Sequence, residues 1–442
     1  MKILQKTGAL QSHLSTNLSK LSTSTTIIIA SAPAPPKNNS PKKSDQNLKL
    51  FQKNLEQHIR QSHFYPSMQF NLKTISYGNN TLSAAYPTIS DIDATMELMT
   101  RTGARNIIGV GSGAAIDLAK ACYYKNVQED ESFGRNGAQL ILNPSTLGGA
   151  MTATSRDCLY FCPDEEALIP LYSNGADVNT TVVVDENVIS IPNWLMSKNI
   201  KGFRDPKGYN ATIVDASLAS LAIALDAAHS LGGDDFDDVT KESFRQSLDE
   251  CITSAMLCLN GMGSSISSST DPSQLEASIE ANKAHALNSV LNAGKLLSFG
   301  HGASFTRRNV SLALTSSLLP EYFPHGNWTT FTASLLPGIC RAIEENPDVA
   351  DAEENDLLLD MVAKVTDRDK STTSLSHLTE WVEKLSTDSE HGFNIPSLSS
   401  LAEGAPDANE LVYKIEDNGA FLSCRDADSE YLESLLVSSL NR

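Results

Sequence analysis

The sequence predicts an open α/β domain with a mostly parallel sheet, followed by an all-helical domain. Two observations support this. Strand-length apolar runs alternate with helical patterns in the first part of the chain, and the strand pattern stops after about residue 191. The strand-like runs lie at residues 25–31, 69–78, 105–110, 138–144 and 180–186. Strands separated by helices pair in parallel through right-handed crossovers. We therefore expect a dinucleotide-binding domain over residues 1–190 and a helical domain over residues 191–442, with a ligand site in the cleft between them.

Apolar residues at three- and four-residue steps indicate the helices. In the first part, residues 45–61 and 87–104 carry this pattern, and Ser90 is a suitable N-cap for the second of these helices. Further helices are predicted at residues 211–231, 241–262, 275–298 and 425–440. The Ser- and Gly-rich stretch at residues 261–274 is predicted to be a mobile connector.

Composition excludes several classes of function. The 442-residue chain is 40% hydrophobic, which suits two packed domains, and its net charge of -19 opposes binding to nucleic acid. No apolar run approaches the roughly 20 residues of a membrane helix. The seven cysteines are scattered, which is typical of reduced thiols in an intracellular protein. Cys158 and Cys162 have no second pair nearby, so we expect them to pack in the fold and not to bind metal.

The N-terminal segment allows two interpretations. Residues 1–44 contain six Lys, many Ser and Thr, and no Asp or Glu, as in a transit peptide for a mitochondrion or plastid. However, leucines at helical spacing in residues 8–21 precede the β-branched run at residues 25–31. A helix followed by a buried strand belongs to a fold, so we expect this second interpretation and a cytoplasmic protein.

A glycine-rich turn separates the strand at residues 105–110 from the helix that begins at Ala114. Gly109, Gly111 and Gly113 allow a sharp turn and bring backbone N–H groups near a ligand. The N-terminus of the helix has free donors and partial positive charge, which suits a pyrophosphate. Asp117 in the first turn is favourable with the helix dipole. The spacing is not G-x-G-x-x-G, so a turn with a purely structural role remains an alternative.

The stretch "GSGAAIDLAKA" at residues 111–121 resembles the G-G-G-S-x-x-D-x-A-K signature of the iron-containing alcohol dehydrogenase family. That family includes glycerol dehydrogenase and maleylacetate reductase, and it is related in fold to dehydroquinate synthase. Gly111, Ser112 and Gly113 take the three glycine places, Asp117 takes the Asp, and Ala114 replaces the Ser. Further resembling segments follow in the same order at residues 86–113, 142–155, 182–192, 221–230 and 323–339.

The resemblance implies an NAD(P)-dependent oxidoreductase that moves hydride between a nicotinamide and an alcohol or aldehyde carbon of a small molecule. The implied cofactor-binding residues are Gly111, Ser112, Gly113, Asp117, Ser145 and Thr146. Family members that prefer NAD carry Asp just after the first strand, where this chain has Ser31 or Ala32. Without that carboxylate, NADP is also admissible. Lys37 is a candidate partner for its 2′-phosphate, although a solvated loop lysine is an alternative.

The resemblance also implies a divalent metal ion, iron or zinc, held by an Asp, a His four residues later, and two His fourteen residues apart. Asp226 and His325 match two of these ligands, but Ser230 and Ser311 occupy the other two places. Serine hydroxyls are poor ligands for these ions. His229 lies about 100° from the i+4 direction on a helix and so points elsewhere. Metal binding is therefore doubtful.

Two interpretations of Asp226 and His325 stay open. In one, Asp226 caps a helix or pairs with Arg307 or Arg308, and His325 is a loop histidine. In the other, an altered metal site persists. The implied catalytic residues are His325, Asp226 and Arg308. Without a metal the oxyanion needs another stabilising group, and the candidates for that role are Arg307, Arg308 and His325. The alternatives are a metal-independent enzyme like maleylacetate reductase, a catalytically inactive nucleotide-binding relative, and a lyase of the dehydroquinate synthase kind. We expect a possible homodimer, with neither nucleic acid nor membrane as a partner.

Overall fold

The computed structural model describes most of the chain in two compact units, Met1–Ser197 and Lys198–Arg442. The described residues are 1–6, 8–17, 25–31, 71–75, 86–135, 137–165, 167–173, 175–184, 206–230, 237–268, 272–299, 310–323, 328–345, 352–387, 393, 395, 397–402, 404, 406–417 and 429–440. The helix predicted at residues 45–61 lies outside them.

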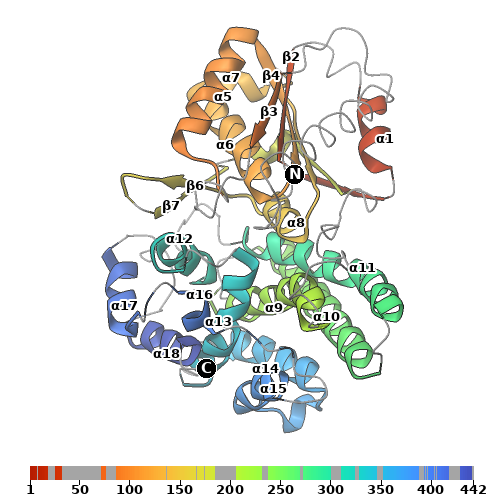
Figure 1. The fold of residues 1–442 in the computed structure, drawn as a ribbon, viewed down its shortest axis with the longest axis vertical. Helices are drawn as coiled ribbons and strands as arrows, with labels where there is room; N and C mark the ends of the chain where they lie inside the picture. Colours follow the sequence, from red (N-terminus) through yellow and green to blue (C-terminus); the bar gives the residue numbers. More distant parts are fainter. Residues whose placement is uncertain are drawn as a thin grey trace. The chain divides into compact units, whose positions relative to one another are not determined.

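The first unit contains a six-stranded parallel sheet with the strand order β1-β8-β5-β4-β2-β3 (Figure 1). Its strands are β1 (Lys2–Gln5), β2 (Thr25–Ser31), β3 (Asn71–Ile75), β4 (Ala104–Gly111), β5 (Leu140–Pro144) and β8 (Thr180–Val184). β5 and β8 are buried along their whole length, as expected for a parallel sheet that is covered on both faces. The predicted fold class is confirmed.

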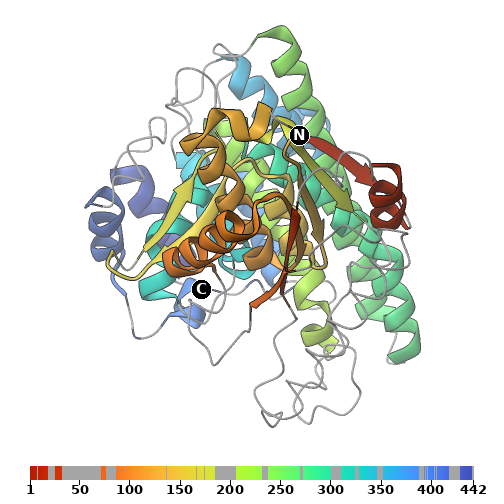
Figure 2. The same ribbon diagram turned by 90° about the horizontal axis from the view of Figure 1, so that it is seen from above.

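Helices lie on both sides of this sheet. They are α1 (Ala9–Thr16), α5 (Ile89–Thr102), α6 (Gly113–Glu129), α7 (Glu131–Arg135) and α8 (Leu147–Thr154). Figures 1 and 2 show α1 on the opposite side of the strands from α5. The N-cap prediction for α5 is wrong, because Thr88 is the N-cap and forms a capping box with Asp91. An antiparallel hairpin of β6 (Cys158–Cys162) and β7 (Ala167–Leu171) follows α8.

The N-terminal residues belong to the sheet. β1 pairs with β8, and β2 lies between β4 and β3. On α1, Leu10 and Leu14 are buried. Removal of residues 1–31 would take away two strands of the sheet, so their interpretation as part of the fold is confirmed.

The second unit is helical over its described residues. Its longer helices are α9 (Pro206–Ser230), α10 (Asp238–Ser268), α11 (Pro272–Leu296), α12 (Val310–Tyr322), α13 (Trp328–Glu345), α14 (Ala352–Thr366), α15 (Ser376–Thr387), α17 (Ala408–Asp417) and α18 (Ser429–Leu440), with the single turn α16 (Leu398–Leu401). Every residue from 216 to 229 of α9 is buried. A helix without a polar face has to lie in the interior, and α9 packs against α10, α11 and α13.

The predicted connector at residues 261–274 is mostly helix. α10 continues to Ser268, and α11 begins at Pro272. Glycine at residue 261 lets α10 approach α11 closely, since a side chain there would collide with Asn282. Within the part of the chain that the structure describes, no helix is both long and apolar enough to cross a membrane.

Candidate functional site

The glycine-rich turn is the point at which β4 passes directly into α6. β4 ends at Gly111 and α6 begins at Gly113, so Ser112 alone joins them. Gly111 has φ 137°, a conformation that favours glycine. The side chain of Ser112 forms no capping hydrogen bond to the helix. Gly109 has a different role, because a Cβ there would lie 2.7 Å from Cβ of Ala119 and would force α6 away from β4.

A second strand-to-helix turn lies beside the first. β5 ends at Pro144, and α8 begins at Leu147 with Thr146 as N-cap. Thr146 Oγ1 accepts a hydrogen bond from the N–H of Gly149 at 3.0 Å. The N–H of Ser145 donates to the carbonyl oxygen of Gly111 at 2.8 Å, and this bond joins the two turns. Both helices therefore begin at the carboxyl edge of adjacent parallel strands.

The two turns pack backbone against backbone at Gly149. A Cβ on Gly149 would lie 3.0 Å from the carbonyl oxygen of Gly111 and 3.3 Å from the carbonyl carbon of Ser112. At Gly113, the nearest atom to an added Cβ would be Oγ1 of Thr152 at 3.3 Å. Glycine at residue 149 thus allows the two helix N-termini to lie side by side. The resemblance over residues 142–155 predicted no role for Gly149.

Asp117 lies inside the fold. Its side chain is buried on α6, and its Oδ1 accepts a hydrogen bond from the N–H of Leu159 on β6 at 3.3 Å. Burial raises the pKa of Asp117 to about 7, although Lys120 and the Leu159 N–H act in the opposite direction. A direct role in cofactor binding stays a prediction, and the observed contact joins α6 to the β6–β7 hairpin.

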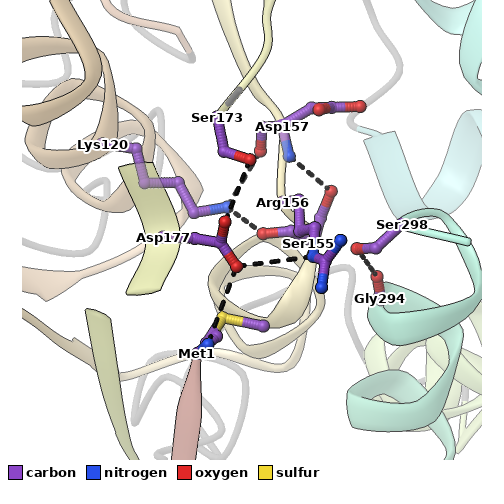
Figure 3. Close-up of polar contacts among 9 residues, drawn as sticks. All are labelled: Met1, Lys120, Ser155, Arg156, Asp157, Ser173, Asp177, Gly294 and Ser298. Carbon is purple, nitrogen blue, oxygen red and sulfur yellow. Dashed lines mark hydrogen bonds and ion pairs between the residues drawn. The ribbon is translucent and has the colours of Figure 1, made fainter. Parts of the chain in front are cut away.

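Lys120, one turn after Asp117, is completely buried. Its Nζ donates a hydrogen bond to the carbonyl oxygen of Thr152 at 2.5 Å. It also donates to the carbonyl oxygens of Ser155 at 2.5 Å and Asp157 at 2.8 Å, two residues that are drawn in Figure 3. Lys120 matches the lysine of the family signature, but no role was predicted for it. The signal that could have found it is a lysine on an otherwise apolar stretch of α6.

In the second unit, two of the four predicted metal-ligand positions contact each other. Asp226 of α9 and Ser311 of α12 are both buried. Asp226 Oδ2 accepts hydrogen bonds from the N–H of Ser311 at 2.7 Å and from its Oγ at 2.9 Å. Ser311 lies in the first turn of α12, where backbone N–H groups have no partner within the helix. Asp226 therefore caps α12, as one of the two open interpretations predicted.

This arrangement fits a divalent ion at Asp226 poorly. One of its two carboxylate oxygens, Oδ2, is bound by two hydrogen-bond donors of Ser311. His229 stacks on Tyr431, with ring centroids 5.5 Å apart and planes 7° apart. Across the described ranges, no cluster of three or more His, Cys, Asp or Glu side chains is placed to hold a metal. Ser230 is the last residue of α9.

The remaining residues predicted for this site, His325, Arg307 and Arg308, lie outside the described ranges. A partly buried acid for which no role was predicted is Asp215 of α9, which accepts a hydrogen bond from Thr330 at 3.0 Å. Burial raises the pKa of Asp215 to about 6.

Similar proteins are found by comparison of structures and not by comparison of sequences. No family model matches the sequence, and no curated protein matches it in a sequence search. Maleylacetate reductase from Rhizobium sp. strain MTP-10005 is 14% identical with a TM-score of 0.59, covering 100% of this chain and 96% of that one. Iron-containing alcohol dehydrogenase from Thermococcus thioreducens is 13% identical with a TM-score of 0.64, covering 100% and 98%. An iron-containing alcohol dehydrogenase from Thermotoga maritima is 11% identical with a TM-score of 0.58, covering 100% of this chain and 98% of that one.

This chain has the fold of the iron-containing alcohol dehydrogenases and maleylacetate reductases. The resemblance predicted from residues 111–121 is confirmed at the level of the fold. Identities of 11–14% leave the cofactor, the metal and the reaction to be argued from the residues of this chain.

Proposed function

We propose that the first unit binds NAD or NADP, with the diphosphate held at the N-termini of α6 and α8. The observation that carries this proposal is that these two helices begin side by side, at the carboxyl edge of the adjacent parallel strands β4 and β5. Ligands of open α/β sheets bind at this edge, and a helix N-terminus attracts anions through its N–H groups and dipole. The lack of side chains at Gly111 and Gly113 supports a close approach of the diphosphate to the backbone.

We further propose that the chain is an oxidoreductase acting on an alcohol or aldehyde. The fold shared with proteins named alcohol dehydrogenase and maleylacetate reductase supports this proposal. A bound nicotinamide would supply the hydride acceptor or donor. The chain would have to bind the substrate and stabilise charge on its oxygen. His325 and Arg308 stay the predicted groups for that charge.

The proposed reaction does not use a metal ion at Asp226. The carboxylate there is bound by the N–H and hydroxyl of Ser311, and serine is a weak ligand for iron or zinc. The reaction would then resemble the metal-independent alternative given by the sequence. We keep one second candidate, a nucleotide-binding protein without catalysis, because two of the four metal-ligand positions are serines and Asp226 is bound by one of them.

Titration calorimetry with NAD, NADP and ADP tests the nucleotide site directly. We expect binding of ADP together with at least one dinucleotide, because the proposed contacts are to the diphosphate. Adenosine is the matched control, since it lacks the phosphates and should bind more weakly than ADP. Equal affinity for ADP and adenosine, or no binding by any of the four compounds, would contradict the proposal.

A panel of alcohols and aldehydes separates the enzyme from the inactive relative. The absorbance of the reduced nicotinamide would report turnover, measured with and without a chelator. Turnover that is unchanged by the chelator supports a metal-independent oxidoreductase. Tight nucleotide binding with no turnover supports the second candidate, and turnover that the chelator abolishes contradicts both.

A further inference from the structure

Lys120 is the most unusual buried group of the first unit. Its side chain is completely buried on α6, and all its described hydrogen bonds go to backbone carbonyl oxygens. Of the three acceptors, Thr152 lies in the last turn of α8, Ser155 is its C-cap, and Asp157 directly precedes β6. Figure 3 shows Lys120 beside Ser155 and Asp157. Burying a lysine is costly unless the charge is compensated, so this contact has to contribute something that an apolar side chain would not.

The number and length of these hydrogen bonds indicate the ammonium form. A lysine ammonium has three N–H donors, and three carbonyl oxygens lie within 2.8 Å of Nζ. The last carbonyls of a helix carry partial negative charge and have no partner within the helix. Lys120 therefore supplies both the donors and the charge that the C-terminal end of α8 requires.

α8 is thus fixed to the β4–α6 segment at both of its ends. At the N-terminal end, Gly149 packs against the backbone of Gly111 and Ser112. At the C-terminal end, Lys120 holds the carbonyl groups of Thr152 and Ser155. Because α8 has only eight residues, a shift at one end is transmitted to the other.

The segment after α8 has a second attachment. Arg156 Nε forms an ion pair with Asp177 Oδ2 at 3.4 Å, and Asp177 Oδ1 accepts a hydrogen bond from Ser173 Oγ at 3.2 Å (Figure 3). Arg156 is half exposed, so this ion pair is expected to contribute little. The buried lysine remains the main attachment of the segment.

We infer that Lys120 is a positioning residue for the nucleotide site. It fixes the C-terminal end of α8 and so places the N-terminus of α8 beside that of α6, where the diphosphate would bind. Lys120 itself makes no contact with the nucleotide. The inference rests on the proposed function for the ligand, whereas the attachment of α8 is a property of the chain alone.

The test compares Lys120→Met with Tyr123→Phe. Methionine keeps a similar length but cannot donate to the three carbonyls. Tyr123 lies one turn along the same helix and is also buried, and its hydroxyl donates to the carbonyl oxygen of Ala138 at 3.1 Å. Ala138 precedes β5 and so lies at the opposite edge of the sheet from the turns. Tyr123→Phe therefore removes a buried hydrogen bond without affecting α8.

Two measurements are made well below the unfolding temperature of each variant. In Lys120→Met we expect the amides of residues 150–157 to exchange hydrogen faster and ADP to bind about tenfold more weakly, the equivalent of one lost hydrogen bond. Tyr123→Phe should change neither quantity. Lost stability alone would not alter the ADP affinity of a fully folded protein, so the affinity separates positioning from a merely structural role.

The outcomes test the positioning role of Lys120 separately from the proposed nucleotide site. Unchanged exchange at residues 150–157 overturns the inference, and so does unchanged ADP affinity in Lys120→Met. If the unaltered protein does not bind ADP, the proposed function fails, and hydrogen exchange alone then decides whether Lys120 holds α8. Should Lys120→Met not fold, Lys120→Arg replaces it. Arginine keeps the charge, but its planar donors cannot converge on three carbonyls, so the same local loosening is expected.

Discussion

Replacement of Asp226 distinguishes a capping carboxylate from a metal ligand. Asp226→Ala removes the acceptor for two buried donors of Ser311, its N–H and its hydroxyl. Each orphaned buried donor costs about 1–3 kcal/mol, so we expect the free energy of unfolding to fall by about 4 kcal/mol. Asp226→Asn keeps one oxygen that can accept these hydrogen bonds, loses the charge and replaces the other oxygen with an NH2 group. Its expected cost is about 1 kcal/mol, from the weaker interaction with the N-terminus of α12.

Ser311→Ala completes the series. It removes the hydroxyl but leaves the backbone N–H of Ser311 bound to Asp226, so the expected loss is about 1 kcal/mol. Urea unfolding followed by circular dichroism measures all three variants, because it reports the loss of the helices.

The same experiment with a chelator supplies the refuting result. For a capping carboxylate, the chelator leaves the unfolding midpoint of the unaltered protein in place, and Asp226→Asn stays close to it. For a metal ligand, the chelator destabilises the unaltered protein, and Asp226→Asn is as damaging as Asp226→Ala because an amide oxygen is a poor replacement for a carboxylate. The second pattern, together with bound iron or zinc in the purified protein, would refute the capping role.

Three further predictions concern single residues. Gly149→Ala should lower the free energy of unfolding by about 1–3 kcal/mol and weaken ADP binding, because the added Cβ meets the backbone of Gly111. Urea unfolding measures the stability, and calorimetry measures the ADP affinity. Gly113→Ala should be milder, because its Cβ meets only the hydroxyl of Thr152, and equal effects of the two changes would count against backbone packing at residue 149. Asp215→Asn should flatten the pH dependence of stability between pH 4 and 6. The pKa of Asp215 rises from 3.8 to about 6 on folding. Its contribution to the free energy of unfolding is therefore complete below about pH 4 and is lost as the pH rises through 6, a difference of about 3 kcal/mol. If the stability of Asp215→Asn varies with pH in parallel with that of the unaltered protein, the raised pKa is contradicted.

Local patterns predicted most of the sheet and the core helices. The run "TTIIIAS" at residues 25–31 is β2 over its full length. The helix predicted at residues 425–440 is observed as α18, on which Tyr431, Leu432, Leu435 and Leu436 are buried. These predictions hold because the spacing of apolar residues reports which side of a strand or helix faces the core.

Other elements could not be predicted from local pattern. α8 begins with "LGG", and glycine disfavours helices, yet the helix forms because Gly149 packs against the backbone of the neighbouring turn. Residues 261–268 also continue as helix, and Gly261 allows a close approach of α10 to Asn282 of α11. At α8, tertiary packing outweighs the intrinsic preference of the residues.

The order of amino acids alone specified the parallel sheet, the helical second half and the location of the glycine-rich turn, since apolar periodicity and glycine are local properties. Only the tertiary structure decided the roles of the polar groups. Asp226 finds its donors 85 residues away on Ser311, and Lys120 finds its acceptors 32 to 37 residues further along the chain. A buried charge is stable only beside compensating partners, and the fold determines which residues those are.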